Sequence, residues 1–223
     1  IVWGGAPSIV DMRSGSTPMG AIETAMIDGG YAAVGKSLGM PVHAYLGATD
    51  SKLVDAQAGY ESGMTALVGG LAGIDMISGP GMLDFLLTQS PEKLVLDADM
   101  IGMVQRLLRG VATPTETLAT GFFEAAGPEG RFLELQDTRR LFRSEQFLPS
   151  LMSDRSSRRG WLDAGGLDAF GRARARVEEI MATHQVPALA PDVAAGLVGI
   201  VRDAGAPFGL GDALPGAPDG LAS

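Results

Sequence analysis

Short apolar segments alternate with helical patterns along the first 110 residues, and this alternation constrains the fold more than any other feature of the chain. Apolar runs at 1–10, 42–46 and 74–77 predict three strands, each followed by a segment with apolar residues at helical spacing. Such alternation is typical of a parallel sheet whose strands are joined by helices. The sequence therefore predicts an α/β fold, either a doubly wound sheet or a (β/α) barrel. No G-x-G-x-x-G or P-loop motif follows any strand, which disfavours a nucleotide-binding doubly wound sheet.

Helix boundaries can be predicted from capping residues. Thr17-Pro18 predicts a helix with Thr17 as its N-cap, Ser90-Pro91 predicts another, and residues 113–116 form a capping box for a third. Gly39 and Gly73 predict helix ends. The predicted inward-facing stripes are Ile22, Met26, Val34 and Leu38 in the first helix, Met64, Leu67, Val68 and Leu71 in the second, and Leu94, Ile101, Val104 and Leu108 in the third.

The texture of the chain predicts three parts. Residues 1–130 carry the alternation of a partial (β/α) barrel, and residues 131–185 are rich in arginine and predict helices associated with that barrel. Residues 186–223 form a C-terminal extension rich in glycine, proline and alanine, which we expect to be mobile from about residue 205. Three strands cannot close a barrel, and Ile1-Val2-Trp3 resembles the middle of a buried strand, so we expect an N-terminal portion upstream.

Charge and cysteine content exclude several classes of function. The net charge is −9, from 26 acidic and 17 basic residues, so a nucleic-acid-binding groove is not expected. The chain has no cysteine, which excludes disulfides, thiolate catalysis and cysteine–zinc sites. No apolar stretch is long enough to predict a membrane span and no signal peptide is visible, so a cytoplasmic protein is expected.

The loop after the second predicted strand is the candidate site. Asp50, Lys52, Asp55, Gln57 and Glu61 follow one another within a dozen residues. In parallel α/β proteins, ligands bind in the loops that follow the carboxyl ends of strands. Carboxylates and an amide without cysteine or histidine suit a small cation or a proton transfer better than zinc, and no metal site is predicted.

Several short motifs resemble the trimethylamine methyltransferase (MttB-like) superfamily from residue 1 to about residue 185. The resemblance rests on Asp55, Gln57, Tyr60 and Glu61; on Leu71, Gly73 and Asp75; on Gly79 and Gly81; on Ser90, Glu92 and Asp97; on Thr115 and Thr117; on Gly127, Gly130 and Phe132; on Phe142, Arg143, Glu145, Phe147 and Pro149; and on Asp154, Arg155 and Trp161. Two positions depart from the family pattern. Asp137 precedes Thr138 where many relatives have histidine, and the turn at 78–81 lacks a histidine that some betaine-using members have nearby.

The resemblance implies that this chain is the C-terminal half of a (β/α)₈ TIM barrel with added C-terminal helices. The implied activity is transfer of a methyl group from a tertiary or quaternary methylated amine to the Co(I) form of a corrinoid protein, as in methanogenesis-type methyl transfer. The corrinoid is supplied by that partner, so no tightly bound cofactor is expected. The chain has no nonstandard residue, which matches the members that lack pyrrolysine. We also expect a homo-oligomer.

The candidate residues are assigned by the needs of this chemistry, since a methylated ammonium is held by carboxylate charge and by aromatic faces. The catalytic candidates are Asp55, Gln57 and Glu61, and the substrate-binding candidates are Asp11, Tyr45, Asp50, Lys52, Tyr60 and Ser78. Each also has an ordinary interpretation as a cap, turn, core or surface residue. Two other functions remain open: a TIM-barrel lyase or isomerase that uses paired carboxylates, and a non-catalytic, truncated barrel fragment.

Overall fold

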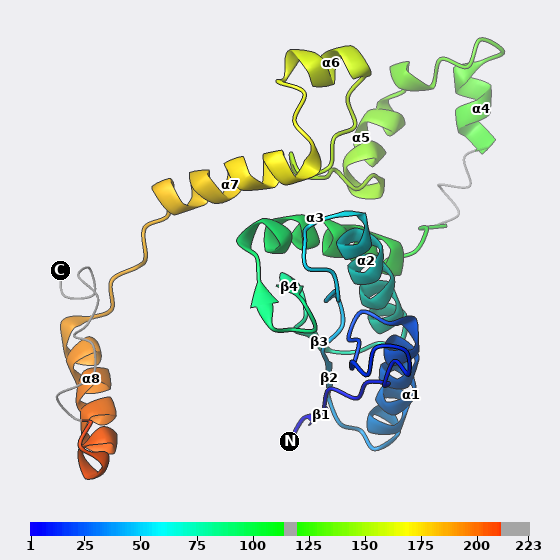
Figure 1. Cartoon of the computed structure of the whole chain (residues 1–223). Helices are drawn as coiled ribbons and strands as arrows, with labels where there is room; N and C mark the ends of the chain where they lie inside the picture. The colour runs from blue at the N-terminus through cyan, green and yellow to red at the C-terminus, as the bar shows by residue number, and fades with distance from the viewer. Residues whose placement is uncertain (114–119, 211–223) are drawn as a thin grey trace. The chain divides into compact units, whose positions relative to one another are not determined.

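The computed structural model describes residues 1–113 and 120–210, and it divides the chain into two compact units, Ile1–Glu179 and Ile180–Ser223 (Figure 1). The elements, in chain order, are β1 (Trp3–Gly4), α1 (Ile22–Ser37), β2 (Val42–Ala44), α2 (Ala56–Leu71), β3 (Met76–Ile77), β4 (Met82–Leu83), β5 (Thr88–Gln89), α3 (Pro91–Leu108), α4 (Thr120–Ala126), η2 (Phe132–Glu134), α5 (Gln136–Glu145), α6 (Arg158–Asp163), α7 (Ala169–Thr183), α8 (Pro191–Gly205) and η3 (Ala206–Phe208). The candidate site lies wholly in the first unit.

The first three strands form a parallel sheet in the order β1-β2-β3. Gly4 pairs with His43 between β1 and β2, and His43 pairs with Met76 between β2 and β3. Strands β4 and β5 form a separate antiparallel hairpin. The α/β class predicted from the alternation is confirmed. The strands themselves are shorter than predicted, because only two or three residues of each apolar run pair with a neighbour.

Small residues on the helices allow close packing against the sheet. A Cβ atom at Gly69 of α2 would lie 2.8 Å from Ile77 Cδ1 and 2.9 Å from Leu46 Cδ1. On α1, a Cβ atom at Gly35 would lie 2.6 Å from the Trp3 ring. Both contacts are too short for any side chain larger than hydrogen, so each glycine is required by the close approach of its helix. The buried core beside these contacts consists of Ala25, Ala44 and Leu46, with Val68, Ile74 and Ile77 packed against it.

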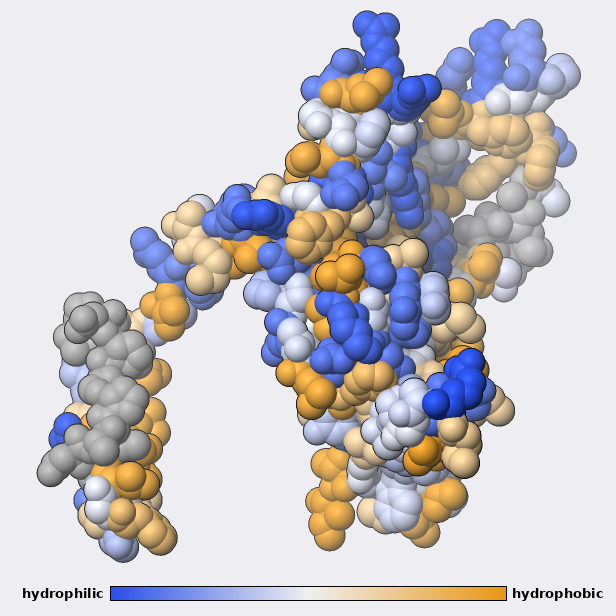
Figure 2. Space-filling model, in the orientation of Figure 1, coloured by the Kyte–Doolittle hydropathy of each residue, from blue (hydrophilic) through white to orange (hydrophobic). Residues whose placement is uncertain are grey.

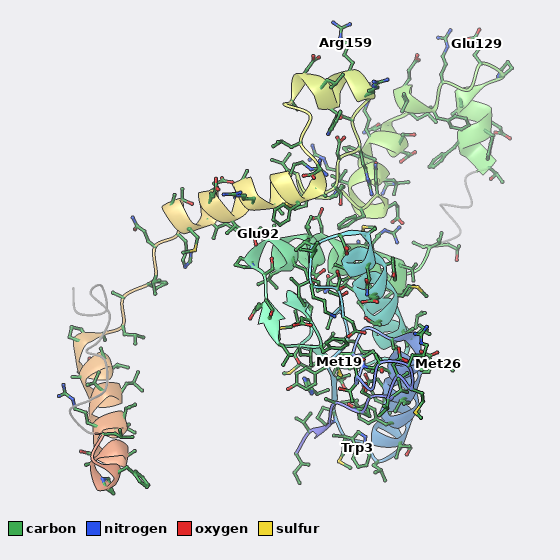
Figure 3. All side chains as sticks on the ribbon, viewed as in Figure 1. Trp3, Met19, Met26, Glu92, Glu129 and Arg159 are labelled. Carbon is green, nitrogen blue, oxygen red and sulfur yellow. The ribbon has the colours of Figure 1, made fainter. Side chains whose placement is uncertain are left out.

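The predicted inward stripe is therefore wrong for α1 and only partly right for α2, where Val68 packs against the core. The side of α2 that packs inward carries Ala58, Ser62, Thr65, Ala66 and Gly69. The larger apolar residues face outward instead: Met26 is 67 % exposed and lies on the outer side of α1, and Leu71 is 65 % exposed (Figure 3). Val34, Leu38 and Met64 are exposed too. On α3, Val104 and Leu108 of the predicted stripe lie against Gly70 of α2. Leu94 is exposed, however, and the buried residues of this helix are Lys93, Asp97 and Asp99.

The helix boundaries predicted from capping residues are confirmed at some positions and wrong at others. The Ser90 side chain caps α3 as predicted, accepting from Lys93 N at 3.1 Å, and Gly73 ends α2 in the left-handed conformation. The helix predicted at Thr17-Pro18 is wrong at its start, since α1 begins at Ile22. The backbone N–H groups of residues 19 and 20 donate to a side chain from another loop, so they do not initiate the helix. Most of the capping box at 113–116 lies outside the described residues.

Helix α8 belongs to the second unit and exposes apolar side chains at helical spacing, namely Val193, Leu197, Ile200 and Val201 (Figure 2). The short helix η3 follows it directly, and the rest of the extension, where mobility is predicted, lies outside the described residues. Within the described ranges, no helix is both long and apolar enough to cross a membrane.

Candidate functional site

A cavity of about 890 Å³ opens between the segment that follows β1 and the loop that joins β2 to α2. Its walls come from residues 9–23, residues 50–61 and Phe85, which lie far apart in the sequence. The charged side chains of the lining are five carboxylates and two cations: Asp11, Glu23, Asp50, Asp55 and Glu61, with Arg13 and Lys52. The cavity therefore carries an excess of negative charge at the edge of the sheet where the sequence predicts ligand binding.

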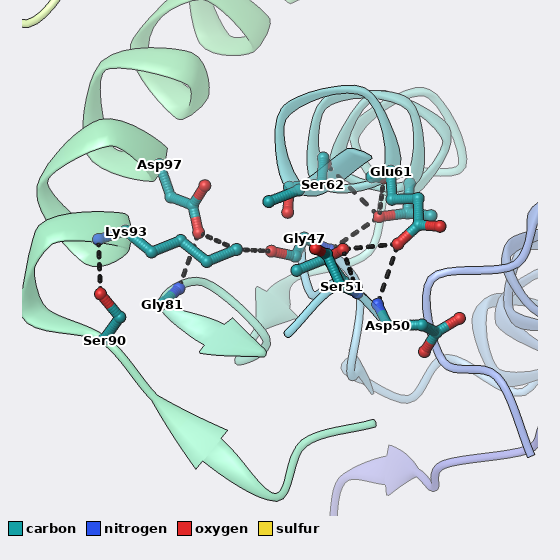
Figure 4. Close-up of polar contacts among 12 residues, drawn as sticks. Gly47, Asp50, Ser51, Glu61, Ser62, Gly81, Ser90, Lys93 and Asp97 are labelled. Carbon is teal, nitrogen blue, oxygen red and sulfur yellow. Dashed lines mark hydrogen bonds and ion pairs between the residues drawn. The ribbon is translucent and has the colours of Figure 1, made fainter. Parts of the chain in front are cut away.

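Glu61 is a carboxylate of the lining that accepts three hydrogen bonds. Thr49 Oγ1 and Asp50 N donate to Glu61 Oε2, at 2.5 and 2.8 Å, and Gln57 Nε2 donates to Oε1 at 2.8 Å (Figure 4). Thr65 connects the same turn of α2 to the loop, since its Oγ1 donates to the Glu61 carbonyl and accepts from Gly47 N. These bonds hold the Glu61 carboxylate in one position and fix the loop against α2.

Asp50 is a buried carboxylate, only 8 % exposed, at the cavity wall. Its Oδ1 accepts from Met19 N at 2.8 Å and from Gly20 N at 3.0 Å, which ties the segment before α1 to the loop after β2. Burial raises the pKa of Asp50, opposed by these two hydrogen bonds. Within the part of the chain that the structure describes, no donor reaches Asp50 Oδ2. That oxygen is therefore available to a ligand.

Asp55 caps α2. Its Oδ1 accepts from Ala58 N and from Ser51 Oγ, both at 3.0 Å. The hydrogen bond from the Ala58 amide lowers the pKa of Asp55, so this carboxylate is ionised at neutral pH. Gln57 lies in the first turn of the same helix and reaches Glu61, which gives the amide a partner.

Lys52 and Phe85 meet at the cavity. Lys52 Nζ lies 4.1 Å from the centroid of the Phe85 ring, donates to the Asp50 carbonyl at 2.8 Å, and lies 3.5 Å from Asp84 Oδ1. An ammonium group over a ring face at this distance makes a favourable cation–π contact. The cavity thus already contains a geometry that binds a nitrogen cation.

Asp11 and Arg13 form a pair on another wall. Arg13 donates to Asp11 from its backbone at 2.8 Å and from its guanidinium at 2.9 and 3.2 Å. The Arg13 guanidinium lowers the pKa of Asp11 to about 2. Because the two charges neutralise each other, this wall adds little net field to the cavity.

A buried ion pair supports the site from behind. Lys93 and Asp97 of α3 lie 2.5 Å apart, with side chains 2 % and 7 % exposed (Figure 4). Lys93 Nζ also donates to the Gly47 carbonyl at 3.3 Å, and Asp97 Oδ2 accepts from Gly81 N at 2.7 Å. The pair therefore connects α3 to the loop after β2 and to the turn before β4. Burial raises the pKa of Asp97, and Lys93 opposes that rise.

The structure brings six of the nine sequence candidates to this cavity: Asp11, Asp50, Lys52, Asp55, Gln57 and Glu61. The lining does not include the other three. Tyr60 lies on α2 with 59 % of its surface exposed. Tyr45 and Ser78 instead contact His43, with ring centroids 4.9 Å apart for Tyr45 and a 2.7 Å hydrogen bond for Ser78.

Sequence reasoning missed Phe85, which is the aromatic face of this cavity. It lies in the turn between β4 and β5. In the sequence, α2 and β3 separate this turn from the loop after β2, which Phe85 covers. The available signal is an aromatic residue in the segment directly after the third strand. Its local pattern does not show which loop it contacts.

Comparison with known proteins agrees with the resemblance in the motifs. The family model for trimethylamine methyltransferase (MTTB) matches residues 1–203. This chain belongs to the trimethylamine methyltransferase family. It is 34 % identical over 210 residues to the glycine betaine methyltransferase of Desulfitobacterium hafniense (94 % of this chain, 43 % of the relative). It is also 34 % identical over 208 residues to trimethylamine methyltransferase MttB2 of Methanosarcina mazei (93 % and 42 %), and 33 % identical over 210 residues to MttB of Methanosarcina barkeri (93 % and 42 %). The chain therefore spans less than half the length of these relatives.

Proposed function

We propose that this chain binds a methylated amine in an enzyme that transfers one of the amine's methyl groups to the Co(I) corrinoid of a separate protein. Family membership supports methyl transfer. The names of the relatives, glycine betaine and trimethylamine methyltransferases, support a tertiary or quaternary amine as the methyl donor. The corrinoid protein is a second substrate in this proposal and supplies the nucleophile.

The observation that carries the proposal is the ammonium group over an aromatic ring in an acidic cavity. A quaternary ammonium cannot donate N–H hydrogen bonds, so it depends on carboxylate charge and on ring faces for its binding energy. The cavity offers both, through Asp50, Glu61 and Phe85. A carboxylate about 5 Å from a cation contributes about 3 kcal/mol of attraction at an effective dielectric constant of about 20, before desolvation.

The reaction asks little of the protein's acids and bases. The donor is a quaternary ammonium or a tertiary amine in its protonated form. The C–N bond breaks with its electron pair left on nitrogen, so the amine departs as a neutral molecule and the methyl group passes to the Co(I) of the second substrate. The residues of the chain then have two tasks, to hold the cation and to orient one methyl group toward the acceptor. Hydrogen-bonded carboxylates such as Glu61 suit this role, because their charge stays in a fixed position.

We further propose that the parallel sheet β1-β2-β3 is part of a (β/α)₈ barrel. The supporting observations are its parallel order and the helices that connect consecutive strands. Ligand sites of such barrels lie at the carboxyl ends of the strands, where this cavity is found.

A proton-abstracting lyase or isomerase is the alternative enzyme. It would need Asp55 or Glu61 to exchange protons with a substrate. Asp55 caps α2 and Glu61 accepts three hydrogen bonds, so the geometry favours fixed charges over acid–base groups.

The test uses the protein in its natural form with a reduced corrinoid protein and a panel of amines: trimethylamine, glycine betaine and tetramethylammonium. We expect the Co(I) absorbance to decay with at least one of them, and the rate to fall in Asp50→Asn and Phe85→Leu. Lys36→Met, which changes a surface lysine paired with Asp75, serves as a matched control and should leave the rate unchanged. Persistence of Co(I) with every amine would refute the methyl-transfer proposal.

A further inference from the structure

Lys52 occupies the place in the cavity that best suits a foreign cation. Its ammonium lies over the Phe85 ring and beside the Asp50 carbonyl. The Lys52 side chain is 61 % exposed, and its pair with Asp84 is loose at 3.5 Å. The side chain can therefore leave the ring without disrupting a buried contact, unlike Lys93.

The Phe85 ring, in contrast, is held firmly in place. Asp84, Phe85 and Leu86 all adopt the left-handed conformation, with φ of 49°, 57° and 71°. Three such residues in succession put strain on the backbone, because residues other than glycine rarely adopt this conformation. The turn keeps this conformation because it is docked on the loop that carries Lys52: Thr49 N donates to the Met82 carbonyl at 3.2 Å, and Asp84 N donates to the Ser51 carbonyl at 3.0 Å. A strained turn that presents an aromatic face toward a cavity is typical of a binding site.

We propose that Lys52 is a built-in, displaceable occupant of the cation subsite on Phe85, which a methylated ammonium must expel in order to bind. This inference rests on the proposed function, since it assigns the subsite to the same class of substrate. In the free protein the Lys52 ammonium covers the ring. When a methylated ammonium arrives, Lys52 moves toward Asp84 and solvent, and the ligand takes over the ring face and the field of Asp50 and Glu61.

The proposal defines how Lys52 sets affinity. Expelling it costs the cation–π contact, roughly 0.5–1 kcal/mol at an exposed site, which corresponds to about a two- to five-fold loss of affinity. A quaternary ammonium recovers this by making its own contact with the ring. The contrasting role for Lys52 is to bind a carboxylate on the substrate, in which case its removal would weaken binding of a betaine and would not strengthen binding of a simple ammonium.

The first experiment needs no enzymatic activity. These 223 residues contain three lysines, Lys36, Lys52 and Lys93, and in a protein labelled with ¹³C in lysine the Cε signal of each can be assigned by a single substitution. We expect the Lys52 methylene signal to be shifted upfield by the Phe85 ring current and to lose this shift in Phe85→Leu. Titration with tetramethylammonium should move the Lys52 signal toward its solvent position and leave Lys36 and Lys93 in place. A Lys52 signal at its solvent position in the free protein, or one that millimolar tetramethylammonium does not move, would overturn the proposal.

The second experiment is a double-mutant cycle on the binding of tetramethylammonium, measured by calorimetry. Lys52→Met should tighten binding by about two- to five-fold when Phe85 is present. In the Phe85→Leu background the gain should be clearly smaller, because no ring contact is left to be vacated. Lys36→Met is the control for a general loss of positive charge. Weaker binding in Lys52→Met, or an equal gain in both backgrounds, would overturn the proposal in favour of a ligand role or a plain charge effect.

The two proposals can fail separately. If tetramethylammonium displaces Lys52 but no amine consumes Co(I), the cation subsite stands and the methyl-transfer proposal fails. If amines are demethylated while Lys52 stays in place, the displacement proposal fails and the proposed function stands.

Discussion

Removing the buried ammonium of Lys93 should destabilise the fold far more than removing an exposed one. In Lys93→Met, the Asp97 carboxylate stays buried and keeps only the hydrogen bond from Gly81 N, while the Gly47 carbonyl loses its donor. Breaking one partner of a buried ion pair costs about 3–5 kcal/mol. For a chain of this size that corresponds to a melting temperature lower by roughly 6–20 °C.

The matched control is Lys36→Met. Lys36 pairs with Asp75 at 2.8 Å, but their side chains are 39 % and 46 % exposed. Exposed pairs contribute about 0–1 kcal/mol, so this variant should melt within a few degrees of the parent. Both variants remove one positive charge and keep a long apolar side chain, so the difference between them measures the effect of burial.

The double variant Lys93→Met/Asp97→Asn tests whether the loss of stability comes from the unpaired charge left on Asp97. The asparagine introduced there keeps an acceptor for the Gly81 N–H and carries no charge. We expect the double variant to recover at least about 2 kcal/mol relative to the sum of the two single changes, because it leaves no unpaired charge buried. Thermal and urea unfolding followed by circular dichroism measure all four proteins of this cycle and the Lys36→Met control. Equal losses in Lys93→Met and Lys36→Met, or strict additivity in the cycle, would refute this account of how α3 supports the site.

Three further predictions concern single positions. Asp28 is fully buried, burial raises its pKa from 3.8 to about 6, and both carboxylate oxygens lack a partner in the described ranges. The folded state therefore binds the Asp28 proton more tightly than the unfolded state does, so the free energy of unfolding should fall by about 3 kcal/mol as the pH rises from about 4 to above 6. Asp28→Asn should flatten this pH dependence in urea unfolding. A parent protein whose stability does not change over this pH range would contradict the prediction. In Gly20→Ala the new Cβ would lie 2.5 Å from Glu61 Oε2, so the affinity for tetramethylammonium should drop several-fold, whereas Gly30→Ala, with no atom within 4 Å, should leave affinity unchanged. A bound cation favours the ionised form of Asp50, whose pKa is raised by burial, so binding of tetramethylammonium should weaken as the pH falls through that pKa. Asp50→Asn should bind the cation weakly and with less dependence on pH, and calorimetry at several pH values measures both effects.

The features that the sequence predicted well are local ones. A strand, a polar loop and a helix follow one another at 42–61, so their side chains lie close together in any fold that keeps this order. Ser90 and Gly73 acted as helix signals because capping depends on neighbouring residues alone. The parallel arrangement followed from the alternation of elements.

The features that failed depend on contacts between distant segments. Apolar periodicity marked Met26 and Leu71 as inward-facing, but both are exposed, and the closest approach of α1 and α2 to their neighbours is at Gly35 and Gly69, where no side chain fits. The start of α1 is delayed because Asp50, which is distant in the sequence, binds the amides of the preceding turn. Phe85 enters the cavity only through the docking of a hairpin turn. None of these contacts is encoded in a local pattern.

The cavity combines a rigid frame with a movable cation. Lys93 and Asp97 fix the start of the loop at Gly47, and Glu61 fixes its middle at Thr49 and Asp50. Rigid carboxylates keep their field without reorganising when a ligand binds, which favours a cation in one position. The Lys52 side chain has no such bonds to hold it, apart from its contact with a backbone carbonyl and an exposed pair. In our proposal, affinity depends on the difference between two cations on one ring, the protein's own and the ligand's. A change that strengthens only the Lys52 contact should then weaken ligand binding by up to the same free energy.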